Sequence, residues 1–124
     1  MINNFEDFTY ELTEQEKSLL PMLIKGLSNK TSEEPIKASD IVSKMNKFNY
    51  GTNLPKMHDV RLRKMVNYIR SKGILPIIAT SKGYFVSYDE NIILEQIESL
   101  TQRAKSIENC ANGLHKFLNN DNNN

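Results

Sequence analysis

The stretch RLRKMVNYIRSKGILPIIATSKGYFVS, residues 61–87, decides the fold of this chain. Its first half predicts a helix with an apolar face at helical spacing: Leu62, Met65, Val66 and Ile69. Gly73 is expected to end that helix, because glycine is common just past a helix C-terminus. Two short runs of strand-forming residues follow, 77–79 and 84–86, and a four-residue turn ending in Gly83 joins them. The stretch therefore predicts a helix that leads directly into a β-hairpin.

Two more helices are predicted ahead of this stretch. Thr13 and Glu16 have the spacing of a capping box, in which each side chain binds the backbone N–H of the other residue. Apolar residues at helical spacing follow, and Pro21 is expected to kink this first helix or to mark a local weakness in it. The second helix is predicted over 39–46, and the third from near Pro55 to Lys72. The expected core draws on these helices and the hairpin: Leu19, Leu23, Ile24, Ile41, Val42, Leu62, Val66, Ile69, Ile77 and Tyr84.

A long last helix is predicted over 91–118. Small or apolar residues recur in it at alternating steps of four and three, the heptad pattern of a coiled coil: Ile93, Ile97, Leu100, Ala104, Ile107, Ala111, Leu114 and Leu118. A helix of this length spans about 40 Å at 1.5 Å per residue, so we expect its apolar seam to need a partner. The simplest partner is the same helix in a second copy of the chain. The alternatives are a fold back over its own body or docking on another protein.

Composition and organisation indicate one domain with extensions. The expected parts are an N-terminal arm (1–10), a compact domain (11–90), the long helix (91–118) and an asparagine-rich tail (119–124) that is expected to be disordered. No apolar run approaches the ~20 residues of a membrane span, and the N-terminus does not resemble a secretory signal. Cys110 is the single cysteine, so no internal disulfide is possible. We therefore expect a cytoplasmic protein that does not enter a membrane.

The net charge of +1 hides an uneven distribution. Residues 1–52 carry 8 acidic and 6 basic residues, and residues 87–124 carry 6 acidic and 3 basic residues. Residues 53–86 carry one acidic and 7 basic residues, a net charge of +6. Such a basic block is typical of proteins that bind a polyanion, although it also occurs on solvated helices.

The order of helix, helix, basic helix and hairpin resembles a winged helix-turn-helix DNA-binding domain. It looks most like the small winged-helix proteins of bacteriophages and mobile elements, over roughly residues 11–90. The resemblance is carried by LTEQE at 12–16, by RLRKMVNYIR at 61–70 and by GILPIIATSKGY at 73–84. It implies a mainly α fold with a small β-hairpin (α+β), and duplex DNA as the partner. It further implies a role in transcription regulation, or as an accessory factor in replication or recombination.

The DNA contacts are expected on the third helix and at the tip of the hairpin, the wing: Lys56, Arg61, Arg63, Lys64, Asn67, Ser81 and Lys82. By helical geometry, Lys56, Arg61 and Lys64 lie opposite the core and offer contacts to phosphates or base edges. Arg63 lies at the edge of that face, and Asn67 suits adenine. His58 is expected to pack or to cap the helix.

No pattern in the chain predicts an enzyme. The two histidines are far apart, and no metal-ligand spacing, glycine-rich phosphate loop or nucleophile elbow occurs. We therefore expect neither a metal nor a cofactor. The alternative to DNA binding is a protein–protein adaptor, in which the domain and the last helix bind a phage or host protein.

Overall fold

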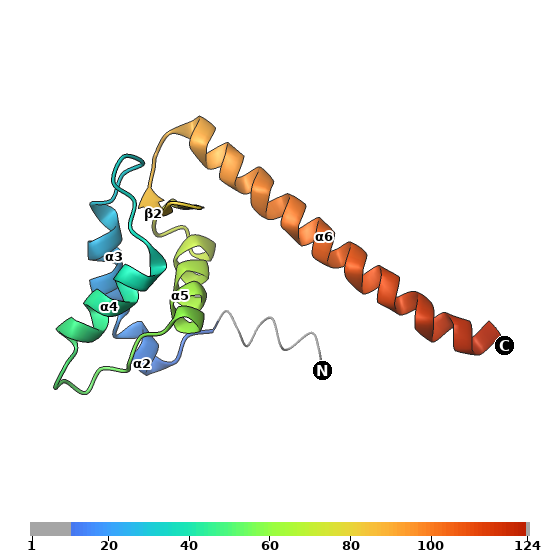
Figure 1. Cartoon of the computed structure of the whole chain (residues 1–124), viewed down its shortest axis with the longest axis horizontal. Helices are drawn as coiled ribbons and strands as arrows, with labels where there is room; N and C mark the ends of the chain where they lie inside the picture. The colour runs from blue at the N-terminus through green and yellow to red at the C-terminus, as the bar shows by residue number, and fades with distance from the viewer. Residues whose placement is uncertain (1–10, 124) are drawn as a thin grey trace. The chain divides into compact units, whose positions relative to one another are not determined.

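The protein is described here by a computed structural model of residues 11–123, with side chains described as far as Leu118. The predicted arm, 1–10, lies outside the described residues. The chain divides into two units, which are the residues up to Tyr88 and those from Asp89 onward. Its elements follow in the order α2 (Glu14–Lys17), α3 (Leu20–Ser28), α4 (Ala38–Phe48), α5 (Asp59–Ser71), β1 (Ile77–Thr80), β2 (Gly83–Val86) and α6 (Glu90–Asn123) (Figure 1). The predicted α+β class, mainly helical with one small antiparallel hairpin, is confirmed.

The first unit begins with the predicted capping box. The Glu16 N–H donates to Thr13 Oγ1 and the Thr13 N–H donates to Glu16 Oε1, both at 3.0 Å. The helix that follows is interrupted rather than kinked near Pro21: α2 is a single turn, and α3 begins again at Leu20. Pro21 lies in the first turn of α3, where its missing N–H leaves no intrahelical hydrogen bond unmade.

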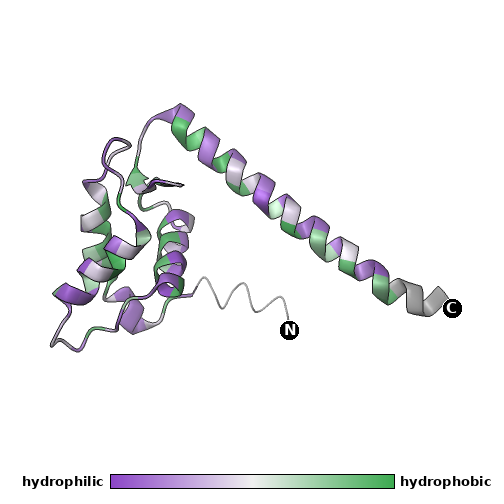
Figure 2. Ribbon diagram, viewed as in Figure 1, coloured by the Kyte–Doolittle hydropathy of each residue, from purple (hydrophilic) through white to green (hydrophobic). Residues whose placement is uncertain are grey.

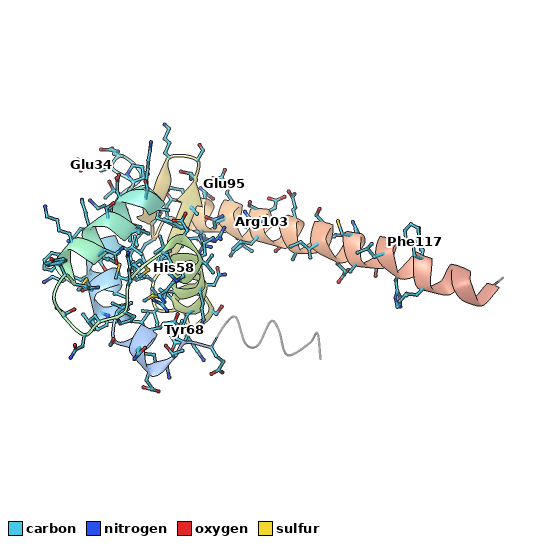
Figure 3. All side chains as sticks on the ribbon, turned by 60° about the horizontal axis from the view of Figure 1, so that its bottom comes forward. Glu34, His58, Tyr68, Glu95, Arg103 and Phe117 are labelled. Carbon is cyan, nitrogen blue, oxygen red and sulfur yellow. The ribbon has the colours of Figure 1, made fainter. Side chains whose placement is uncertain are left out.

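The third predicted helix, α5, begins at Asp59, four residues later than the expected start at Pro55. The side chain of Asn46 on α4 explains the delay, because it binds both backbone groups of Met57. The Met57 N–H donates to Asn46 Oδ1 at 2.7 Å, and Asn46 Nδ2 donates to the Met57 carbonyl at 3.0 Å. His58 is the N-cap, as one of its two predicted roles required: its Nδ1 accepts from the Arg61 N–H at 3.2 Å (Figure 3). At the other end Lys72 is the C-cap, and Gly73 follows it with a φ of 66°.

The hairpin is tighter than predicted. Thr80 pairs with Gly83, so the loop has two residues, Ser81 and Lys82, rather than four. A segment ahead of α4 also joins the hairpin, through hydrogen bonds of 2.9 and 2.8 Å between the backbones of Ile36 and Tyr84. Gly83 has a φ of 131°, and a Cβ there would lie 2.5 Å from the Ile36 carbonyl oxygen. Glycine is therefore required at this position both by φ and by the neighbouring backbone.

The core lies among the helices and the inner side of the hairpin. Seven of the predicted core residues are buried: Leu19, Leu23, Ile41, Leu62, Val66, Ile69 and Ile77. The other three, Ile24, Val42 and Tyr84, are partly buried against this cluster. The core also takes in residues that were not on the predicted list: Leu12, Leu27, Met45, Met57 and Met65.

The second unit is α6, a helix of 34 residues. At 1.5 Å per residue it is about 51 Å long. It continues to Asn123, through most of the tail that the sequence predicts to be disordered, and Asn124 lies outside the described residues. Asparagine has a modest helix propensity but does not break a helix that is already formed. Within the part of the chain that the structure describes, none of the helices has a stretch apolar and long enough to cross a lipid bilayer.

Candidate nucleic-acid interface

The solvent-facing side of α5 carries a short row of unpaired side chains. The buried residues of α5, which include Leu62 and Ile69, turn one face to the core. Val60, Arg63 and Asn67 are exposed, at the i, i+3, i+7 spacing of a single helix face. Val60 is 63% exposed, although it is apolar. No hydrogen bond or ion pair within residues 11–118 engages Arg63 or Asn67, so both side chains can reach a ligand.

Arg61 and Lys64 are not free in the way the sequence predicts. The Arg61 Nε lies 2.9 Å from Glu16 Oε2, and the Lys64 Nζ lies 2.8 Å from Glu16 Oε1. Their side chains are only 24% and 23% exposed. A second guanidinium nitrogen of Arg61 donates to the Lys56 carbonyl. The interpretation of these two residues as open phosphate contacts therefore needs correction: they pair with an internal carboxylate.

Glu16 combines two roles in one side chain. It is 4% exposed, caps α2 and binds both cations of α5. Burial alone raises the pKa of a carboxyl, but the hydrogen bonds from Lys64, Thr13 and Arg61, together with the Lys64 charge, outweigh that effect. They lower the pKa of Glu16 from 4.5 to about 2. Glu16 is therefore ionised at neutral pH, and the cluster that we call the Glu16 clamp (Glu16, Arg61 and Lys64) has a net charge of +1.

The remaining predicted contacts lie at the start of α5 and at the hairpin tip. Lys56, Ser81 and Lys82 are exposed. A hydrogen bond within the hairpin fixes the backbone of the loop: the Lys82 N–H donates to Thr80 Oγ1 at 3.2 Å. The side chain of Lys82 is exposed to solvent, as the sequence predicts for the tip of the hairpin.

The hairpin and α5 are joined by Arg70. Its Nε donates to the Ile77 carbonyl at 2.9 Å, at the start of β1. Nearby, the Lys72 Nζ lies 5.8 Å from the centre of the Tyr68 ring, within the range of a cation–π contact. Arg70 therefore fixes the hairpin against the C-terminal end of α5, and its guanidinium is not available as a free DNA contact.

A second candidate surface is the apolar stripe of α6. Figure 2 shows apolar residues recurring along the whole described length of this helix. The larger predicted seam residues are exposed at Ile97 (51%), Ile107 (63%) and Leu114 (69%). Phe117, which the heptad list did not include, is also exposed, and Figure 3 shows its side chain projecting from the helix. The seam is thus an exposed stripe of apolar residues on α6, with only alanine at 104 and 111.

Sequence reasoning missed two features of this interface. The first is the Glu16 clamp, whose members are 45 and 48 positions apart, so that no local pattern reveals the pairing. The second is exposed Val60, to which the sequence analysis assigned no role. Among the described residues, no group of three or more His, Cys, Asp or Glu side chains is arranged to hold a metal ion.

Comparisons with known proteins find no relative of this chain. A scan against protein-family models finds no match, and searches of curated proteins and of solved structures find no significant match.

Proposed function

We propose that this chain is a non-enzymatic, DNA-binding protein of the winged-helix kind that phages and mobile elements encode. In this proposal α5 enters the major groove of duplex DNA and the hairpin contacts the backbone beside it. The observation that carries the proposal is the exposed row on α5, in which Val60, Arg63 and Asn67 have no partner within the described protein. A role in transcription regulation, or as a replication or recombination accessory factor, is the biological expectation.

The chemistry of the row suits base edges. Arginine pairs with guanine O6 and N7, asparagine pairs with adenine N6 and N7, and an apolar side chain packs on the thymine methyl group. Arg63, Asn67 and Val60 supply one of each. Lys56, ahead of α5, and Lys82, in the hairpin loop, are exposed cations that suit phosphate oxygens.

The Glu16 clamp changes the expected salt dependence. If Lys56, Arg61, Lys64 and Lys82 all met phosphates, log affinity would fall with log salt at a slope near −3.6. With Arg61 and Lys64 held by Glu16 and Arg63 assigned to a base edge, the cations left for phosphates are Lys56 and Lys82, and two contacts give a slope near −1.8. The charge arrangement therefore supports moderate binding that is lost at high salt.

The test is a gel shift of the full chain on random duplex DNA over a salt series. We expect binding at low salt, a slope near −1.8, and weaker binding with little change of slope in Arg63→Ala. Lys105→Ala is the matched control, because Lys105 is an exposed cation on α6 outside the proposed surface. Absence of binding to duplex DNA or heparin at low salt would refute the proposal. Equal effects of the two variants would refute the placement of the site on α5.

We also propose that the apolar stripe of α6 forms a homodimer. The exposed isoleucines and leucines at heptad spacing support it, and two copies would bring two α5 helices to one duplex. Light scattering tests this at tens of micromolar protein. We expect twice the mass of the 14.3 kDa chain, and a monomer for Leu100→Asp/Ile107→Asp. A wild-type mass of one chain would refute the dimer.

A protein–protein adaptor is the second candidate function. The same exposed stripe favours it, because an apolar helix face can equally dock on another protein, and the last 38 residues carry 6 acidic and 3 basic residues. Acidic charge there does not favour DNA contact. Retention of the full chain on duplex DNA at low salt separates the candidates, because an adaptor would not be retained.

A further inference from the structure

A groove of about 610 Å³ lies between α3 and α4. None of its lining residues belongs to α5 or to the hairpin, so it is a surface separate from the proposed DNA face. Its volume is within the range of sites that bind ligands, roughly 300–1,000 Å³. The apolar lining comes mainly from the two helices: Met22, Leu23 and Leu27 on α3, and Ile41, Met45 and Phe48 on α4.

The apolar lining runs from the core to the solvent. Leu23 and Leu27 are buried, whereas Phe48 is 79% exposed, an unusual state for so large an apolar side chain. Met22 and Met45 lie one on each helix, and methionine side chains adapt to the shape of an apolar ligand. Large apolar side chains therefore suit this groove.

The charge of the groove has one sign. Lys25, Lys30 and Lys44 line it, and none of its lining residues within the described chain is acidic. The ion pairs within residues 11–118 involve other cations, so these three ammonium groups are not neutralised by a carboxylate of the described protein. A ligand for this surface should therefore carry carboxylates beside its apolar groups.

The backbone around the groove favours a helix as the ligand over an extended strand. A strand would need free backbone N–H and C=O groups to pair with. Ile36, which lines the groove between α3 and α4, already pairs both groups with Tyr84, at 2.9 and 2.8 Å. Lys30, also between the helices, donates to the Leu27 carbonyl and accepts from the Val86 N–H.

A third helix needs no backbone partner, because it packs its side chains between those of the two walls. The longer wall, α4, has 11 residues and is therefore about 16 Å long. A helix of about three turns matches that length.

Gly26 adds an independent observation. It is an exposed residue inside α3, where glycine weakens a helix relative to alanine. A Cβ at this position would meet no atom within 4 Å, so no packing within the described protein requires a glycine there. Gly26 lines the groove, and the absence of a side chain allows the backbone of a ligand to approach closely.

We propose that the α3–α4 groove binds an acidic amphipathic helix of a partner protein. The apolar face of that helix packs on the methionines and on Phe48, with its closest approach at Gly26. Its carboxylates lie beside the apolar face and meet the three lysines of the groove. The proposal concerns a surface other than α5 and does not depend on DNA binding.

A labelled synthetic peptide tests the proposal on the full chain, by fluorescence anisotropy at low salt. The peptide is a helix of about three turns, with Leu and Phe at i, i+3 and i+7 spacing and Glu and Gln elsewhere. We expect one-to-one binding with a Kd on the order of 10 μM. One control peptide replaces each Glu by Lys, and the other replaces each Leu and Phe by Ser; both should bind at least about tenfold more weakly.

Paired variants of the protein locate the site. Gly26→Gln fills the groove with a good helix former, so α3 keeps its fold while affinity falls at least about tenfold. Ser28→Gln is its control, because Ser28 is exposed on α3 but does not line the groove.

A second pair tests the charge. Lys44→Glu should weaken binding about fivefold. Lys47→Glu makes the same change in net charge on the same helix but outside the groove, and it should leave the affinity unchanged. Thermal unfolding followed by circular dichroism checks that each variant is folded.

Four results would overturn the proposal. No binding at about 1 mM peptide would show that the groove has no affinity for such a helix. Equal binding of the Lys-containing peptide would remove the role of the lysines. An unchanged affinity in folded Gly26→Gln would place the peptide elsewhere, and binding that is lost in Arg63→Ala would assign it to α5.

Discussion

Glu16→Gln is the substitution that most directly tests how the first unit is held together. Glutamine keeps the local cap, because Gln serves at this position of a capping box as well as Glu. It removes only the charge that binds Arg61 at 2.9 Å and Lys64 at 2.8 Å. A carboxyl whose pKa falls from 4.5 to about 2 on folding contributes about 3 kcal/mol of stability at neutral pH, at 1.36 kcal/mol per unit. We expect a loss of about that size at pH 7.

The sign of the pH dependence follows from the lowered pKa. Between pH 2 and 4.5 the unfolded chain binds the proton that the folded chain does not, so this stability is present above about pH 4.5 and is lost as the pH falls toward 2. At pH 3 the difference between wild type and Glu16→Gln should be about 1.4 kcal/mol. Urea unfolding at both pH values measures it.

The control is Glu14→Gln, two residues before Glu16 in the same helix. The Glu14 side chain is 91% exposed and lies 3.5 Å from Lys17, so its loss should cost less than about 0.5 kcal/mol. A cost for Glu16→Gln as small as this control, or one that does not change between pH 7 and pH 3, would refute the reasoning. Glu16→Gln also frees Arg61 and Lys64, and on duplex DNA the salt slope should steepen from about −1.8 toward −3.6.

Three other predictions follow from the fold. Ile69→Ala should cost about 2–4 kcal/mol in urea unfolding, because the side chain is fully buried, and a loss below about 0.5 kcal/mol would contradict the orientation of α5. Gly83→Ala should lower the thermal midpoint more than Gly73→Ala, because both have positive φ but only the first brings a Cβ against a backbone carbonyl; equal shifts would contradict that close approach. Asn46→Ala should cost about 2 kcal/mol and speed hydrogen exchange of the Met57 amide, whose partner it removes; unchanged exchange would show that this hydrogen bond is not made.

The parts of the fold that depend on short-range pattern could be predicted from the sequence. Thr13 and Glu16 are three residues apart, and their capping box forms as the spacing indicates. Gly73 ends α5 with positive φ, and the alternation of strand formers gives the hairpin. The heptad stripe of α6 could also be predicted, because its residues are only three or four positions apart in the sequence.

The parts that depend on distant pairs could not be predicted. The start of α5 is set by Asn46, which is 11 positions from Met57, and not by the proline at 55. The contact between Ile36 and Tyr84 crosses 48 positions of chain and makes glycine necessary at 83. At the candidate site the same limit applies: helical geometry placed Arg61 and Lys64 opposite the core with Arg63 at the edge, whereas the folded chain exposes Arg63 and pairs the other two with Glu16.

The length of chain that the Glu16 clamp closes has a consequence for folding kinetics. The helix that carries Glu16 is a single turn, which is not stable alone, and the clamp closes a loop of 45 residues to Arg61. Such a contact is expected to form late, after α5 has packed, because the entropy of closing the loop is lost before the contact is gained. Interactions absent from the transition state act on the unfolding rate and not on the folding rate. We therefore expect Glu16 to control the unfolding rate of the first unit. The buried faces of α3, α4 and α5 are expected to control its folding rate.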